Sequence, residues 1–204
     1  MKTVPHLLAC LALAAATSAQ AVAIVGQPAP AFKAIDTSGK TVSLADFKGK
    51  TVVLEWMNPG CPFVQKHYGA GNMQATQKEA LAKGAVWLSV NSTAVDAGDY
   101  MKPADLAAWV REHQAQPTAT LMDADGKLGR AYGARTTPHM FVIDPQGRLA
   151  YAGAIDSQAS ARREDIASAT NYVKAAVGAV TAGQAVGTAV TPSYGCSIKY
   201  SAGV

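Results

Sequence analysis

The chain has 204 residues, of which 49% are hydrophobic and 16% are charged. This composition excludes a disordered or fibrous chain and predicts a globular protein with a core large enough for one domain. The net charge of +4 is spread along the chain without a Lys/Arg-rich run, so nothing indicates nucleic acid as a partner.

The first 23 residues have the pattern of a secretory signal peptide. Lys2 supplies the positive charge, residues 7–16 form the apolar stretch, and Ala21-Val22-Ala23 is a small-x-small cleavage site, with cleavage after Ala21 as an alternative. About ten apolar residues are too few to span a bilayer. We therefore expect export, to the periplasm of a bacterium, without a stable membrane anchor after cleavage. Residues 24–204 are expected to form a single domain that includes a tail from about residue 183.

A buried central strand is predicted at residues 51–57, after a turn at 37–40 and a short strand at 41–44. Asn58-Pro59-Gly60 breaks the apolar run, and Pro62 is favoured at the first position of a helix, which makes Cys61 the expected N-cap. The free N–H groups and the positive end of the helix dipole favour a thiolate there. Cys61 is therefore expected to be reactive, against the alternative that it is a small buried hydrophobic residue.

Strands and helices are expected to alternate through the rest of the chain. The patterns predict a helix from 62 to about 83 that is interrupted near Gly69 and Gly71, a strand at 85–90, and a helix beginning at Pro103. A strand at 121–122, a short helix at 126–132, a hairpin of strands 136–144 and 149–152, and a helix from about 163 to 182 follow.

Three segments carry a resemblance to a known family: Asn58–Val64, Thr137-Pro138-His139 and Gly195–Lys199. Together they resemble a peroxiredoxin-like branch of the redoxin group, related to alkyl hydroperoxide reductase and thiol-specific antioxidant proteins, over residues 26–200. The resemblance implies a thioredoxin-like α/β fold, a central mixed sheet flanked by helices, with a C-terminal tail. Three positions depart from the relatives. Val64 stands where a C-x-x-C motif has its second cysteine, Asn58 stands where peroxiredoxins have Thr or Ser, and Leu54 stands where they have proline.

The resemblance also implies roles for several side chains. Cys61 would be the nucleophile, and Pro138 would be a cis-proline that leaves the Thr137 backbone as a docking edge for substrate. Arg135 is expected either to support the thiolate with its positive charge or to lie in an exposed loop. Glu55 is expected either to be buried with a raised pKa and to pass protons near the sulfur, or to lie at the surface. Asn58 would replace the missing hydroxyl only in part.

Cys196 is the second cysteine that remains after signal cleavage, and it is either a resolving cysteine for Cys61 or a permanent structural clamp. The expected activity is that of a thiol-dependent oxidoreductase without a cofactor. The Cys61 thiolate attacks a peroxide or a disulfide, Cys196 resolves the product, and an outside dithiol reductant resets the pair. Two alternatives stay open: a thiol-disulfide reductase without peroxidase activity, and a copper carrier that uses Cys61, His139 and Met57.

Overall fold

The structure is a computed structural model that describes residues 22–202 of the chain. The predicted signal peptide therefore lies outside the described residues, apart from its last two positions. Within residues 22–202 no helix combines the length and the apolar character needed to cross a membrane.

A mixed sheet of seven strands forms the centre of the molecule, in the order β2-β1-β5-β4-β3-β7-β8. Its strands are β1 (Lys33–Asp36), β2 (Thr41–Ser43), β3 (Val52–Trp56), β4 (Val86–Asn91), β5 (Ala119–Met122), β7 (His139–Ile143) and β8 (Leu149–Gly153). Strands β3, β4 and β5 are parallel, whereas β7 pairs antiparallel with both β3 and β8. The predicted fold class, a central mixed sheet flanked by helices, is confirmed.

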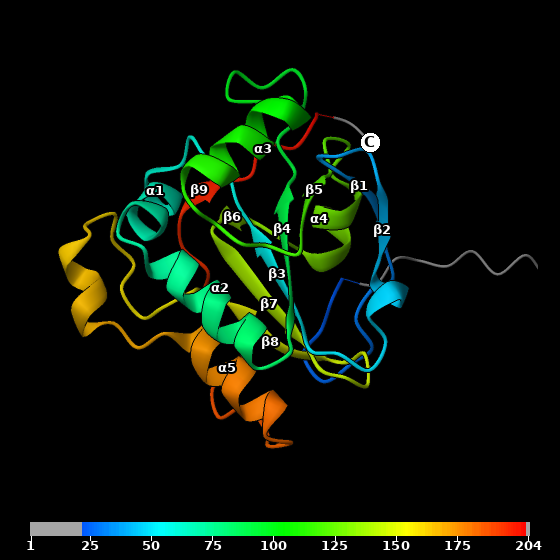
Figure 1. Cartoon of the computed structure of the whole chain (residues 1–204), viewed down its shortest axis with the longest axis vertical. Helices are drawn as coiled ribbons and strands as arrows, with labels where there is room; N and C mark the ends of the chain where they lie inside the picture. The colour runs from blue at the N-terminus through cyan, green and yellow to red at the C-terminus, as the bar shows by residue number, and fades with distance from the viewer. Residues whose placement is uncertain (1–21, 203–204) are drawn as a thin grey trace, which may run out of the picture.

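Helices cover both faces of this sheet (Figure 1). The helices α1 (Pro62–Gly69), α2 (Asn72–Ala82), α3 (Pro103–Glu112) and α5 (Tyr172–Thr181) contribute to one core layer, and α4 (Lys127–Tyr132) packs in the other. Side chains alternate along β3, so Val53 faces the first layer while Leu54 faces the second. Burial on both faces explains why this strand is a continuous apolar run in the sequence.

The helix predicted from 163 to 182 is shorter than expected. Residues Glu164–Ser168 form a separate 3-10 turn, and α5 begins only after Asn171, whose side chain accepts a hydrogen bond from the Lys174 amide at 2.9 Å. An asparagine in this position satisfies one of the free N–H groups of the first turn, so the helix starts there. The predicted interruption after α1 is confirmed, although Gly71, at φ 72°, is the N-cap of α2 in place of Asn72.

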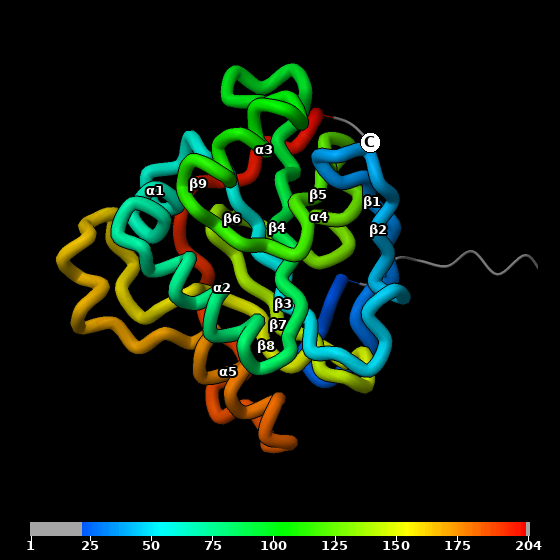
Figure 2. The backbone as a smooth tube through the Cα atoms, viewed as in Figure 1, coloured from blue at the N-terminus to red at the C-terminus, as the bar shows by residue number. Residues whose placement is uncertain are grey.

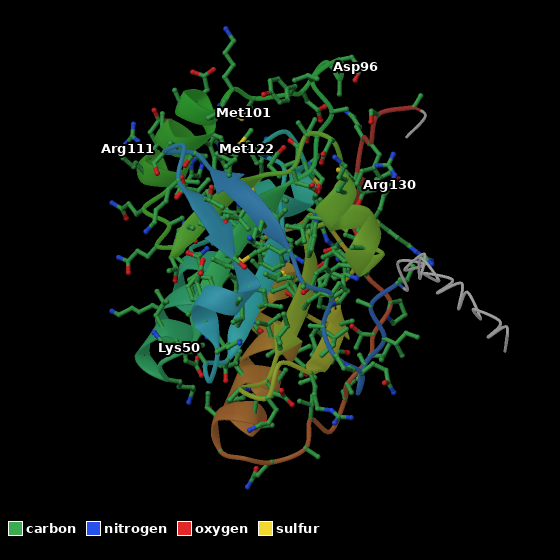
Figure 3. The ribbon with its side chains drawn as sticks, turned by 90° about the vertical axis from the view of Figure 1, so that its right-hand side faces the viewer. Lys50, Asp96, Met101, Arg111, Met122 and Arg130 are labelled. Carbon is green, nitrogen blue, oxygen red and sulfur yellow. The ribbon has the colours of Figure 1, made fainter. Side chains whose placement is uncertain are left out.

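The C-terminal tail returns to the centre of the molecule after α5. It forms β9 (Cys196–Ser197), which pairs antiparallel with β6 (Thr136–Thr137) as a separate two-stranded sheet. Figure 2 follows the tail from α5 at the bottom of the view, past α1 and β6, toward the top of the molecule. There the Lys199 carbonyl accepts a hydrogen bond from the Ala94 amide at 2.9 Å. Further along the tail, the Ser201 carbonyl accepts a hydrogen bond at 2.9 Å from Arg130 of α4, which is labelled in Figure 3.

Candidate active site

Cys61 lies where the sequence predicts, between the end of β3 and the start of α1. It is the N-cap of α1 with an extended backbone, and Pro62 is the first helical residue. The side chain is buried, with 2% of the residue exposed, and its Sγ lies 3.0 Å from the Thr137 carbonyl oxygen. Because the helix leaves its first N–H groups unpaired, the sulfur sits at a point that favours negative charge.

The segment that faces Cys61 comes from two distant parts of the chain. The peptide bond between Thr137 and Pro138 is cis, and Thr137 pairs directly with Cys196 in the register of β6 and β9. Gly195 allows this approach, because its φ is +133° and a Cβ there would overlap the Thr137 carbonyl group. The tail therefore delivers Cys196 to the backbone edge that also contacts Cys61.

The two sulfurs differ in acidity. Burial alone would raise the pKa of Cys61, but hydrogen bonds from the Cys196 thiol, the Thr137 side chain and the Val64 amide outweigh it and lower the pKa. Burial raises the pKa of Cys196 to about 12, and the hydrogen bond and charge of Cys61 act in the same direction. Both cysteines are free thiols in this structure. The pair thus combines a Cys61 thiol whose pKa is lowered with a Cys196 thiol whose pKa is raised.

Asn58 braces the turn before Cys61. Its Oδ1 accepts from the Gly60 amide at 2.8 Å, and its Nδ2 donates to Thr93 Oγ1 at 3.0 Å and to Asp99 Oδ2 at 2.9 Å. The same Asp99 oxygen lies 2.7 Å from Lys199 Nζ. Asn58 therefore connects the cysteine turn to the tail through Asp99, and both of its donor hydrogens already have acceptors.

Glu55 is fully buried, so the expectation of a buried carboxyl group is confirmed and the surface alternative is wrong. Burial raises the pKa of this carboxyl group, against the hydrogen bonds that favour its charged form. The donors to its two oxygens come from β4, α1 and α2, and they are Trp87, Ser89, Tyr68 and Gln77. Glu55 therefore links β3 to β4, α1 and α2. Its four donors do not include Cys61, so a role in passing protons to the sulfur stays a prediction.

Arg135 follows its exposed-loop alternative, because its side chain is exposed. Its backbone contributes to the site: the carbonyl accepts from the Ile198 amide at 3.0 Å, and the N–H donates to His139 Nδ1 at 3.2 Å. The His139 ring lies 4.4 Å from that of Phe141, which belongs to the core layer on the opposite face of the sheet from Cys61. Burial and the charge of Arg135 lower the pKa of His139 to about 4.

The copper alternative therefore lacks a convergent set of ligands. Met57 shares a core layer with Cys61, whereas His139 packs on the other face of the sheet. Within residues 22–202 no group of three or more His, Cys, Asp or Glu side chains is arranged to hold a metal ion.

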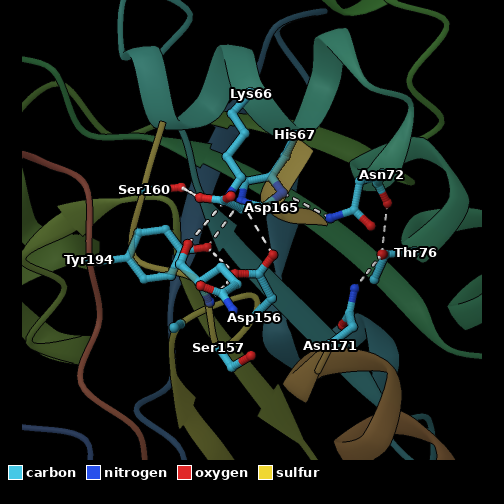
Figure 4. A network of polar contacts seen from close by, with 12 residues as sticks. Lys66, His67, Asn72, Thr76, Asp156, Ser157, Ser160, Asp165, Asn171 and Tyr194 are labelled. Atoms are coloured by element: carbon cyan, nitrogen blue, oxygen red, sulfur yellow. Dashed lines mark hydrogen bonds and ion pairs between the residues drawn. The ribbon is translucent and has the colours of Figure 1, made fainter. Parts of the chain in front are cut away.

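Sequence reasoning missed a buried polar network beside the tail (Figure 4). Tyr194 stands two positions before Cys196, and its hydroxyl group lies 3.1 Å from His67 Nε2 and donates to Asp156 Oδ1. Lys66 is also buried and donates to the Gln158 carbonyl at 2.9 Å. No local pattern marks these residues, since the network forms only when α1, the segment after β8 and the tail come together.

Comparisons with known proteins agree with this geometry. The chain is 27% identical over 125 residues to the thiol-disulfide oxidoreductase ResA of Bacillus thuringiensis subsp. konkukian, a match that covers 61% of this chain and 66% of that protein. The chain thus spans just under two thirds of the length of this curated relative. Among solved structures, a hypothetical protein from Sinorhizobium meliloti superposes with a TM-score of 0.74 at 28% identity, covering 88% of this chain and 96% of that one.

A second solved structure carries a name related to disulfide chemistry. A putative thiol:disulfide interchange protein DsbE from Chlorobium tepidum has a TM-score of 0.53 at 25% identity and covers 64% of this chain and 84% of that one. The fold is therefore thioredoxin-like, as the resemblance implied. The AhpC/TSA family matches residues 25–152, which include β3, Cys61 and the Thr137-Pro138 segment. The chain belongs to the AhpC/TSA family.

Proposed function

We propose that the protein is a thiol-disulfide oxidoreductase that cycles between a Cys61/Cys196 dithiol and a Cys61–Cys196 disulfide. The observation that carries this proposal is the pairing of β6 with β9, which brings Cys196 into register with Thr137 while the Thr137 carbonyl lies 3.0 Å from the Cys61 sulfur. The names of the relatives, which describe thiol-disulfide oxidoreductases and interchange proteins, support the same chemistry. In this scheme Cys196 of the tail takes the place of the second cysteine of a C-x-x-C motif, a position that Val64 occupies in this chain.

In the first step the Cys61 thiolate attacks one sulfur of a disulfide, forms a mixed disulfide and expels the other sulfur as a thiolate that takes up a proton. In the second step Cys196 attacks the Cys61 sulfur of the mixed disulfide, and the remaining half of the substrate leaves as a thiolate. An outside dithiol then returns the pair to its reduced state and is itself oxidised to a disulfide. No cofactor or metal enters this scheme.

The order of these steps follows from the electrostatics of the pair. After burial, the causes that raise the pKa of Cys196 are the hydrogen bond and the charge of Cys61, while Lys199 lowers it. Conversion of the Cys61 thiolate to a mixed disulfide removes the negative charge. Cys196 therefore becomes easier to deprotonate at the step in which it must attack.

A hydroperoxide is the second candidate oxidant, because a small molecule suits a sulfur that is only 2% exposed. The peroxidase prediction relied on Asn58 as a partial replacement for a Thr or Ser, and the contacts of Asn58 with Thr93 and Asp99 give it a bracing role instead. The two oxidants lead to different first products, a mixed disulfide or a sulfenic acid at Cys61.

Rapid mixing of the reduced protein with oxidised glutathione, and separately with hydrogen peroxide, tests the proposal. We expect a Cys61–Cys196 disulfide to form from oxidised glutathione, and a Cys196→Ser variant to stop at the Cys61 mixed disulfide. A Cys61→Ser variant serves as the control and should not react beyond the rate of a free thiol. Failure of wild-type protein to form the Cys61–Cys196 bond with either oxidant would refute the scheme.

Export belongs to the proposal as well, with the periplasm of a bacterium as the compartment. The Ala23 amide donates to the Ala131 carbonyl at 3.0 Å, so cleavage after Ala21 would preserve a contact that cleavage after Ala23 would remove. We therefore favour a mature chain that begins at Val22. Intact mass of protein recovered from a periplasmic extract tests both the cleavage and its position.

A further inference from the structure

Two buried polar side chains contact a partly buried tyrosine of the tail just before Cys196, and the chemistry proposed above does not use these three residues. His67 of α1 is fully buried and Asp156, after β8, is 2% exposed, while Tyr194 joins them from the tail. Burial and the neighbouring Asp156 carboxylate raise the pKa of Tyr194 well above its ordinary value, so its hydroxyl group stays a neutral donor. A buried cluster of this kind costs free energy unless its hydrogen bonds are made, so its geometry is informative.

The hydrogen bonds of the cluster run in one direction. Asn72 Nδ2 lies 2.8 Å from His67 Nδ1, and because an amide nitrogen can only donate, Nδ1 must be the acceptor. The proton of the neutral ring is then on Nε2, which lies 3.1 Å from the Tyr194 oxygen. Tyr194 in turn donates to Asp156 Oδ1. The Tyr194 hydroxyl is therefore held by one donor and one acceptor from two different elements.

Two side chains of α1 also lie close to the Tyr194 ring. Its centroid lies 5.8 Å from that of Phe63, which is two residues after Cys61, and 5.7 Å from Lys66 Nζ. Asp156 Oδ2 has no hydrogen-bond partner among the described residues and lies 4.0 Å from His67 Nε2. One oxygen of Asp156 thus accepts the hydrogen bond of Tyr194, whereas the other would form an ion pair with His67 only if that ring were protonated.

We infer that Tyr194 is the positioning residue that holds Cys196 over Cys61, and that Asp156 and His67 act through it. Only Gly195 separates Tyr194 from Cys196, and glycine is the residue least able to hold a fixed direction by itself. The direction of the Cys196 sulfur must therefore come from contacts on either side of Gly195. Tyr194 supplies them on one side and β9 on the other.

This inference rests on the proposed Cys61–Cys196 cycle and adds a residue that controls it. The rate and the equilibrium of an internal disulfide depend on the effective concentration of one sulfur at the other. If the tail is docked in only a fraction of the protein molecules, the effective concentration of Cys196 at Cys61 is reduced to that fraction of its full value. Loss of the Tyr194 hydroxyl should therefore weaken disulfide formation without any change at either sulfur.

The test compares two tail tyrosines. Tyr194→Phe keeps the ring and removes the hydroxyl group, whereas the control Tyr200→Phe removes the hydroxyl that donates to the Ala134 carbonyl at 2.8 Å, beyond Cys196. Each full-length variant is equilibrated with reduced and oxidised glutathione, quenched with acid and mapped by mass spectrometry. Because hydrogen bonds to charged groups are the stronger ones, we expect the equilibrium constant for the Cys61–Cys196 disulfide to fall about tenfold in Tyr194→Phe. In Tyr200→Phe we expect a change within about twofold.

Asp156→Asn provides a second variant in case Tyr194→Phe does not fold, because it keeps an acceptor oxygen but removes the charge. Its equilibrium constant should fall in the same direction by a smaller factor. A merely structural role would lower the stability of the reduced protein in urea and leave the disulfide equilibrium unchanged. Equal equilibrium constants in wild type, Tyr194→Phe and Asp156→Asn would overturn the inference and leave the proposed cycle intact, whereas absence of the disulfide in wild type would overturn both.

Discussion

At the scale of single residues, the acidity of Cys61 depends on a hydrogen bond from another cysteine. The Cys196 thiol is the first of the contacts that lower the Cys61 pKa against the effect of burial. Removing this thiol in Cys196→Ala should therefore raise the pH midpoint of Cys61 alkylation by iodoacetamide. In the wild type we expect a midpoint below roughly 8.5, the value of an unperturbed thiol.

The control for this measurement is Ser197→Ala, which changes the exposed neighbour of Cys196 on the same strand. Its midpoint should match the wild type. A Cys61 midpoint that is unchanged in Cys196→Ala would mean that the helix N-terminus and Thr137 alone set the acidity of the sulfur.

The two sulfurs should also differ as targets in the oxidised protein. Cys61 is buried and Cys196 is half-buried, so an outside thiolate reaches Cys196 more readily. Attack at Cys196 expels Cys61, the thiol with the lowered pKa, which makes it the better leaving group. Brief treatment of the oxidised protein with reduced glutathione, followed by acid quenching and peptide mapping, should place glutathione on Cys196. Glutathione on Cys61 would contradict this order.

At the scale of secondary-structure elements, the position of β9 depends on the absence of a side chain at residue 195. A methyl group there would overlap the Thr137 carbonyl, and φ of +133° is strained for any residue except glycine. Gly195→Ala should therefore displace β9 and increase the rate at which Cys196 is alkylated in the reduced protein. We expect the rate to rise by about tenfold or more, in line with about 1–3 kcal/mol of strain.

A matched control is available in the same tail. Gly187 has open space around it and no positive φ, so Gly187→Ala should leave the alkylation rate of Cys196 unchanged. If Gly195→Ala behaved like the control, the tail would have to adapt to the added methyl group without leaving β6.

The elements near Cys61 could be predicted from the sequence because their signals are local. Pro62 after Cys61 marks the helix start, and the continuous apolar run of β3 reflects burial on both faces. The position of Cys196 could not be deduced in this way. It depends on the pairing of two-residue strands that are distant in the sequence, and on contacts of the partly buried Tyr194, for which no periodicity exists.

The helix predicted from residue 163 shows where a local pattern fails. Its apolar spacing corresponds to an α-helix only within α5, and the capping side chain of Asn171 decides where the helix begins. Glu55 shows a related effect, because a carboxylate in an apolar strand is compatible with either burial or exposure. The four donors that stabilise its charged form come from residues 68–89, which fold against it.

At the scale of the whole molecule, buried histidines make stability depend on pH. Burial, opposed by Asp156 and reinforced by Lys66, lowers the pKa of His67 from 6.5 to about 4. The unfolded chain therefore binds more protons than the folded one between these values, so this contribution to stability is present above pH 6.5 and is lost as the pH falls toward 4. For a fully buried ring the loss amounts to about 3 kcal/mol.

Urea unfolding of the reduced protein at several pH values between 4 and 7 measures this effect. His139, with a pKa also lowered to about 4, acts in the same direction, whereas the raised pKa of Glu55 acts in the opposite one. The difference between the wild type and His67→Gln isolates the contribution of His67. We expect the free energy of unfolding of the variant to fall less steeply with decreasing pH, and parallel curves would contradict the assignment.

The path of the tail has a consequence for solubility. β8 is the last strand of the sheet, and the segment before Tyr194 runs along it: the Ala152 amide donates to the Ala189 carbonyl at 3.1 Å, and the Thr191 amide donates to the Ala152 carbonyl at 3.2 Å. An uncovered edge strand is a template for pairing with another chain. A chain that ends at residue 187 should therefore self-associate, and light scattering should detect it as aggregation that the full-length protein does not show. The segment that carries the second sulfur would then also protect the fold from edge-to-edge polymerisation.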